Sequence, residues 1–225
     1  MKPLHLSRTI ASLLLLLAAQ NSVASEANPL AMRLYYEVHF VTSDGISHTD
    51  TWQEVMYRQD KHVWMQRALP AKRRAEVHEE GHKHFPLATA GRHFYQDSKG
   101  KTQVQLVSGE DRVIVDLAPS EHDIIGFSGK WSEAYSLMDP ASFTQSGVTH
   151  RTLANGNILH ERKQGNRYER VEWNAKAQIP VRIESGNSAT GDSSLTRLEP
   201  MTSPSVMPWL QLKGLSHRDY SDFGD

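Results

Sequence analysis

Alternation of apolar and polar side chains is the feature of this sequence that most constrains its fold. In the segment MRLYYEVHFVT (32–42), the residues Leu34, Tyr36, Val38 and Phe40 stand at every second position. Successive side chains of a strand point to opposite faces, so a period of two gathers these four on one face. The segment therefore predicts a half-buried β-strand.

The same pattern recurs along the chain, with turn residues between the runs. Asn155-Gly156 lies between two such runs and is a strong hairpin signal. Only 128–140, which Pro140 would end, is typical of a helix. We count eight or nine strands, too many for one flat sheet. The predicted fold is mainly β, a strongly curved antiparallel sheet or open half-barrel, with one or two short helices in or over its concave face.

The first residues have the layout of a secretory signal peptide. Lys2 and Arg8 precede an apolar run that is too short to span a bilayer, and small residues follow it. We expect a signal peptide at 1–24, a curved β domain at 25–186 that carries a His-rich loop at 70–86, and a linker with an aromatic C-terminal tail at 187–225. The mature protein would then be periplasmic or secreted, without a transmembrane anchor.

Composition limits the chemistry that is open to the chain. Cysteine is absent, which excludes disulfides and thiolate ligands. The formal net charge is −1, with 25 basic and 26 acidic residues, so nothing favours nucleic acid as a partner.

The segment AEVHEEGHKHF (75–85) predicts a metal site. His78, His82 and His84 stand close together, Glu79 can add an oxygen ligand, and His93 is the nearest imidazole outside the segment. Imidazole and carboxylate ligands without thiolate suit Zn(II) or Cu(II). The alternative interpretation is a solvated surface loop between Pro70 and Pro86.

A zinc hydrolase is a third interpretation of the same residues. The letters HEEGH match the zincin motif, in which His78 and His82 would bind zinc and Glu79 would act as the general base. In zincins the motif lies within a long helix, whereas here Gly81 weakens a helix and no amphipathic pattern surrounds it. We therefore expect a protein that is not an enzyme.

Two longer segments resemble a known family. YERVEWNAKAQIPVRIES (168–185) has a strand that ends at Asn174 and a Pro180 that opens the next, and WQEVMYRQDKHVWMQRAL (52–69) resembles an early hairpin. Together with a cleaved signal and a central helix, they resemble the periplasmic lipoprotein-carrier-like (LolA/LolB/RseB-like) curved β-sheet superfamily. The resemblance implies a half-barrel around a hydrophobic cavity that accepts acyl chains or peptide segments.

Large apolar residues on the predicted strands are either core or the lining of such a cavity. The candidates for a ligand cavity are Trp52, Met56, Trp64, Met65 and Trp173. In the C-terminal tail, we expect Trp209, Leu210, Leu212 and Tyr220 to dock on this chain or on an envelope protein.

The leading functional hypothesis is a periplasmic protein that buffers or delivers Zn(II) or Cu(II). The alternative is a carrier or sensor of a lipid, lipoprotein or peptide in the concave face.

Overall fold

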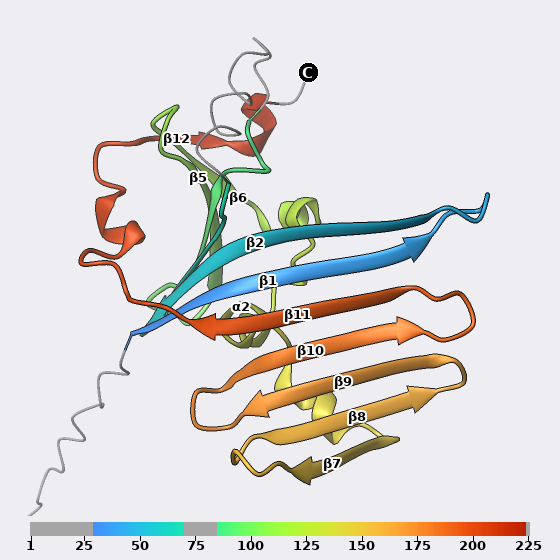
Figure 1. The fold of residues 1–225 in the computed structure, drawn as a ribbon. Helices are drawn as coiled ribbons and strands as arrows, with labels where there is room; N and C mark the ends of the chain where they lie inside the picture. The colour runs from blue at the N-terminus through green and yellow to red at the C-terminus, as the bar shows by residue number, and fades with distance from the viewer. Residues whose placement is uncertain (1–28, 70–84, 224–225) are drawn as a thin grey trace, which may run out of the picture.

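Strands dominate the computed structural model, which describes residues 29–69 and 85–223. Within these residues, twelve strands form one open sheet in the order β12-β6-β5-β4-β3-β2-β1-β11-β10-β9-β8-β7 (Figure 1). Their bounds are β1 Leu30–Val41, β2 Ser47–Gln59, β3 His62–Arg67, β4 Gly91–Gln96, β5 Thr102–Ser108, β6 Val113–Leu117, β7 Val148–Thr152, β8 Ile158–Gln164, β9 Arg167–Asn174, β10 Ile179–Asn187, β11 Ser193–Pro200 and β12 Ser216–Asp219. The mainly β, curved open sheet predicted from the sequence is confirmed.

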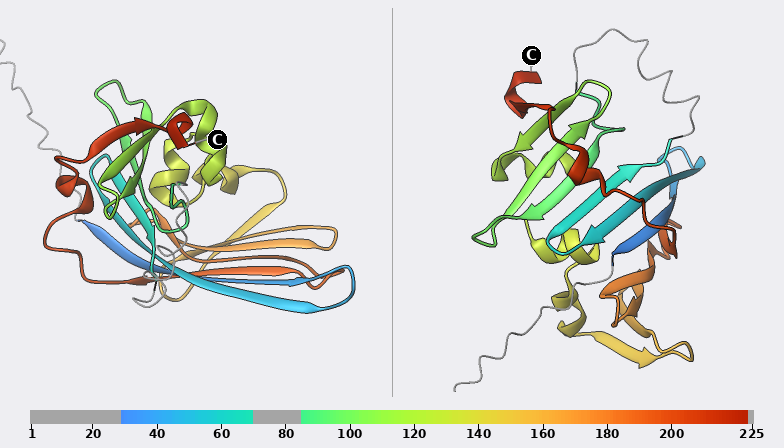
Figure 2. Two further views of the ribbon diagram at one scale, coloured as in Figure 1. Left: turned by 90° about the horizontal axis from the view of Figure 1, so that it is seen from above. Right: turned by 90° about the vertical axis from the view of Figure 1, so that its left-hand side faces the viewer.

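The sheet is bent, and short helical segments lie in the angle between its two halves (Figures 1 and 2). These segments are the 3-10 helix η1 (Pro119–Ile125), the α-helix α2 (Trp131–Ser136) and the 3-10 helix η2 (Pro140–Thr144). We call the face that they cover the concave face and the opposite one the convex face. The predicted helix at 128–140 is thus shorter than expected, because Leu137 ends α2 in a left-handed conformation.

Alternation along the strands builds a core on each face. Met32, Met56 and Met65 are cross-strand neighbours on the concave face and belong to the main core cluster. Trp64, one position from Met65, therefore lies on the convex face, in a second cluster with Val107 and Ile114. The C-terminal segment covers this second cluster with Trp209, Leu212 and Leu215.

Arg58 of β2 ties the helical segment to the sheet. It is 7% exposed, and its guanidinium donates hydrogen bonds to the carbonyls of Tyr135 (2.7 Å), Gln178 (3.2 Å) and Ala177. The same group lies 4.0 Å from the centre of the Tyr135 ring. Burial lowers the pKa of Arg58, and the three carbonyl acceptors compensate for its loss of water. Arg58 therefore fixes α2 and the β9–β10 turn against the concave face.

The C-terminal part departs from the prediction in two ways. Residues 193–200, assigned to a linker, form β11, which lies between β1 and β10 in the middle of the sheet. The tail adds β12, which pairs in parallel with β6, so the sheet is mixed and not purely antiparallel. Trp209, Leu212 and Tyr220 dock as expected, whereas Leu210 is 67% exposed.

The described ranges contain no helix with the length and apolar character needed to cross a bilayer.

Candidate binding groove on the concave face

Four of the five predicted metal ligands, His78, Glu79, His82 and His84, lie outside the described residues. Zn(II) or Cu(II) binding by these residues stays a prediction. Among residues 29–69 and 85–223, no three His, Asp or Glu side chains are grouped so that they could hold a metal ion.

His93, the fifth predicted ligand, lies buried on the convex face, where both of its ring nitrogens are hydrogen-bonded. Nδ1 lies 3.0 Å from Gln105 Oε1, and Nε2 lies 3.0 Å from His62 Nδ1. Gln105 Nε2 donates to Asp116 Oδ1 at 2.8 Å, so Gln105 Oε1 is left to accept a proton from His93 Nδ1. His93 Nε2 therefore accepts from His62. Burial lowers the pKa of His93 to about 4, which keeps the imidazole neutral.

This row of hydrogen bonds fastens the C-terminal segment to the sheet at two points. The ring of Trp209 stacks over His62 at 5.4 Å and over His93 at 6.0 Å. At the other end of the row, His217 Nδ1 pairs with Asp116 Oδ2 at 2.6 Å. The contacts of His93 thus account for its position as part of a docking surface for the chain's own C-terminal segment.

The five residues predicted to line one cavity are divided between the faces. Met56 and Met65 lie in the concave core, and Trp64 lies on the convex face. Trp52 stacks on Tyr36, which packs against the main core, with ring centres 4.9 Å apart. Trp173 packs edge-on against Phe143 under η2, with ring centres 5.2 Å apart. Of the five, only Met65 lines the large concave cleft described next.

A cleft of about 720 Å3 lies between the sheet and the helical segments on the concave face. Its floor is formed by side chains of β1, β3 and β4, namely Tyr36, Met65 and Phe94. The roof comes from the helical region, from Ile125, Phe127, Ala134, Leu137 and Met138. Charged side chains complete the lining, namely Arg92, Lys130, Glu133, Asp139 and Glu169. A cavity of this size with both apolar and polar walls is large enough for a small molecule.

Paired charges border this cleft. Arg92 contacts Glu54 at 2.6 Å, and the hydroxyl of Tyr36 donates to the same carboxylate at 3.3 Å. Burial, and then the charge of Glu54, raise the pKa of Tyr36 far above its ordinary value, so Tyr36 remains a neutral donor. Lys130 and Asp139 pair at 3.2 Å at the roof. Glu133 also lines the cleft, and its carboxylate accepts from the hydroxyl of Ser128.

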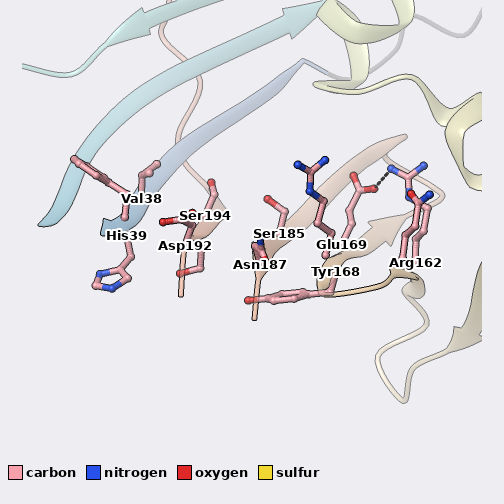
Figure 3. A pocket seen from close by; sticks show the side chains of 14 residues that line it. Val38, His39, Arg162, Tyr168, Glu169, Ser185, Asn187, Asp192 and Ser194 are labelled. Atoms are coloured by element: carbon pink, nitrogen blue, oxygen red, sulfur yellow. Dashed lines mark hydrogen bonds and ion pairs between the residues drawn. The ribbon is translucent and has the colours of Figure 1, made fainter. Parts of the chain in front are cut away.

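A second, open cleft of about 670 Å3 lies at the far ends of β8 to β11 and β1 (Figure 3). Polar side chains line most of it, from Arg162, Gln164, Arg167, Ser185, Asn187 and Ser194 among others. Glu169 of β9 lines both clefts. We call the cleft under the helical segments the inner cleft and the cleft at the far ends of the strands the outer cleft.

Most of these lining residues could not be predicted from the sequence. Phe127 and Leu137 belong to irregular segments, and Arg162 and Ser185 belong to strands that are far apart in the sequence. Alternation assigns each strand residue to one of two faces, but the cleft needs the register between strands as well. The fact that Ser185 lies opposite both Glu169 and Ser194 appears only in the assembled sheet.

Comparison with known proteins finds likenesses in fold alone. No protein-family model and no curated protein sequence matches this chain. Similar solved structures include PNGF-II, at a TM-score of 0.40 and 7% identity over 86% of this chain; the chain spans 33% of the PNGF-II chain. They also include an outer membrane lipoprotein-sorting protein domain from Vibrio parahaemolyticus (TM-score 0.35, 10% identity, 81% of this chain and 89% of that one).

A LolA superfamily protein from Nitrosomonas europaea is similar to the chain as well, at a TM-score of 0.33 and 9% identity over 80% of this chain and 89% of that one. Lipoprotein-sorting and LolA superfamily proteins are thus among its structural neighbours, as the sequence resemblance predicted. With TM-scores below 0.5, these likenesses support no ligand and no activity.

Proposed function

We propose that the protein is a non-enzymatic periplasmic binding protein that carries an amphipathic molecule in the inner cleft of its concave face. The observation that carries this proposal is the mixed lining of this cleft, in which Met65, Phe94, Phe127 and Leu137 lie beside charged and polar side chains. Met65 and Phe94 belong to the main core cluster, and Phe127 and Leu137 pack against it, so the cleft offers the edge of this core to the apolar part of a ligand.

The walls of the cleft differ in how firmly they are held. The floor belongs to a sheet with continuous pairing from β1 through β4. The roof is a set of short helices, which Arg58 anchors through the carbonyls of Tyr135, Ala177 and Gln178. A rigid sheet on one side and short helical segments on the other suit a carrier, because small shifts of the helical segments can admit ligands of different shape.

The test measures binding of a neutral apolar fluorescent probe, N-phenyl-1-naphthylamine, and its displacement by a monoacylglycerol. Phe127→Asp places a charge in the wall of the cleft, and we expect it to weaken probe binding at least about tenfold. Ile124→Asp is the matched control, because Ile124 belongs to the same helical region, is 38% exposed and does not line the cleft.

Equal probe affinity in the two variants would contradict the proposal. Native mass spectrometry of protein purified without detergent gives a second readout. We expect co-purified amphiphiles with the wild type and with Ile124→Asp, and fewer with Phe127→Asp.

A further inference from the structure

Carboxylates outnumber cationic side chains in the lining of the inner cleft. Three carboxylates line it, Glu133, Asp139 and Glu169, against two cations, Arg92 and Lys130. Most of these groups are matched by ion pairs, namely Lys130 with Asp139 at 3.2 Å, Arg92 with Glu54 at 2.6 Å and Glu169 with Arg162 at 2.7 Å. Glu133 forms no ion pair with any residue of 29–69 or 85–223. One negative charge of the lining is therefore left unmatched.

Arg58 does not pair with this carboxylate. Its guanidinium lies on the concave face but does not line the cleft, and the residue is 7% exposed. Its hydrogen bonds go to backbone carbonyls, those of Tyr135, Ala177 and Gln178. A positive group that enters the cleft can thus contact Glu133 without displacing an ion pair.

Local contacts hold the Glu133 carboxylate beside the aromatic walls of the cleft. Glu133 is half-buried in the first turn of α2, and its Oε2 accepts a hydrogen bond from the hydroxyl of Ser128. Ser128 directly follows Phe127, whose ring packs edge-on against Phe94 with ring centres 5.0 Å apart. Within the described part of the chain, Glu133 Oε1 has no hydrogen-bond donor. This oxygen can accept a hydrogen bond from a ligand.

The surroundings of Glu133 favour an organic cation over a metal ion. No three His, Asp or Glu side chains of the described ranges are grouped so that they could hold a metal ion. An ammonium group, in contrast, can bind to one carboxylate and is also attracted by the faces of aromatic rings. Tyr36, Phe94 and Phe127 supply such rings in the lining. Leu137 supplies aliphatic surface for an apolar chain attached to the ammonium group.

We propose that the inner cleft binds an amphiphile with a positively charged ammonium head and an apolar chain. Glu133 contacts the head, and the apolar side chains of the cleft contact the chain. This proposal rests on the proposed carrier function and names its class of ligand. A carboxylate in the first turn of a helix also stabilises the helix, so the test measures the preference for a charged head and not affinity alone.

The test compares two amphiphiles with the same chain, n-decylamine, which is protonated at pH 7, and the neutral 1-decanol. Each is used to displace the neutral probe from the wild type, from Glu133→Gln and from Asp123→Asn. Gln has the shape of Glu and can still accept from Ser128, so α2 is expected to keep its fold. Asp123→Asn is the matched control, because it removes one carboxylate at an exposed position of η1 that does not line the cleft. We expect the wild type and Asp123→Asn to bind decylamine at least about fivefold more tightly than decanol.

In Glu133→Gln, the preference is expected to fall below about twofold with the affinity for decanol unchanged, because the charge-assisted hydrogen bond is lost. A preference that persists in Glu133→Gln, or that Asp123→Asn loses to the same extent, would overturn the role of Glu133. If the wild type binds both amphiphiles equally, the ammonium proposal is wrong while the carrier function stands. If neither amphiphile displaces the probe, both proposals are wrong.

Discussion

Lowering the pH from 7 to 5 is expected to destabilise the fold through His93. The imidazole is 4% exposed, and its pKa is lowered to about 4, chiefly by burial, from an ordinary value of 6.5. A base whose pKa is depressed in the folded state gives stability that is complete above pH 6.5 and is lost as the pH falls toward 4. At pH 5 this difference corresponds to roughly 30-fold in the folding equilibrium, or about 2 kcal/mol.

The acidic groups do not reverse this loss of stability between pH 7 and pH 5. The carboxylates with lowered pKa values, among them Asp97, Asp139 and Asp192, lose their contributions only as the pH falls below about 4. His62 acts in the same direction as His93, because burial lowers its pKa too. Between pH 7 and 5, the net effect is therefore a loss of stability.

The measurement is urea unfolding at pH 7 and at pH 5, followed by circular dichroism. His93→Gln removes the ionisable group and is expected to lower stability at pH 7 while reducing the difference between the two pH values by about 2 kcal/mol. His150→Gln, at an exposed position of β7, is the control and should keep the wild-type difference. An unchanged pH difference in His93→Gln would refute this account of the buried row.

Three further outcomes are expected. Gly91→Ala should destabilise the protein by at least about 2 kcal/mol in urea unfolding, because an added Cβ would lie 2.0 Å from the Trp64 ring; stability within 0.5 kcal/mol of wild type would contradict this. Arg58→Met should cost about 3 kcal/mol by leaving three carbonyls without donors, and a smaller loss than in an exposed Arg→Met control would argue against the anchoring role. Calorimetric titration with Zn(II) and Cu(II) should show binding that His82→Ala and His84→Ala weaken, and millimolar affinity unchanged by either would end the metal hypothesis.

Alternation predicted the strands whose apolar residues keep a strict period of two. It failed for β11, where Leu195 and Leu198 are three residues apart and so lie on opposite faces. Leu198 packs in the concave core, yet its spacing from Leu195 looks irregular in the sequence. β12 has no apolar residue at all, and its contacts with β6 are the parallel pairing and the pair formed by His217 and Asp116.

The face of the sheet on which His93 lies could be predicted from the sequence. It is next to Phe94, and strand geometry places neighbours on opposite faces, so a core Phe94 implies that His93 lies on the other face. The lining of the outer cleft could not be predicted in this way. Arg167 and Ser194 are 27 positions apart in the sequence. They line the same cleft only because of the register in which β10 pairs with β9 and with β11.

The place of β11 between β1 and β10 affects how the sheet can be completed during synthesis. The first strand to emerge keeps one backbone edge unsatisfied until residues 193–200 arrive, since that edge pairs only with β11. A nascent or truncated chain would expose this edge beside the equally unpaired β10, a surface that invites aggregation. Pairing of the first strand on both edges therefore has to wait until residues 193–200 have been made.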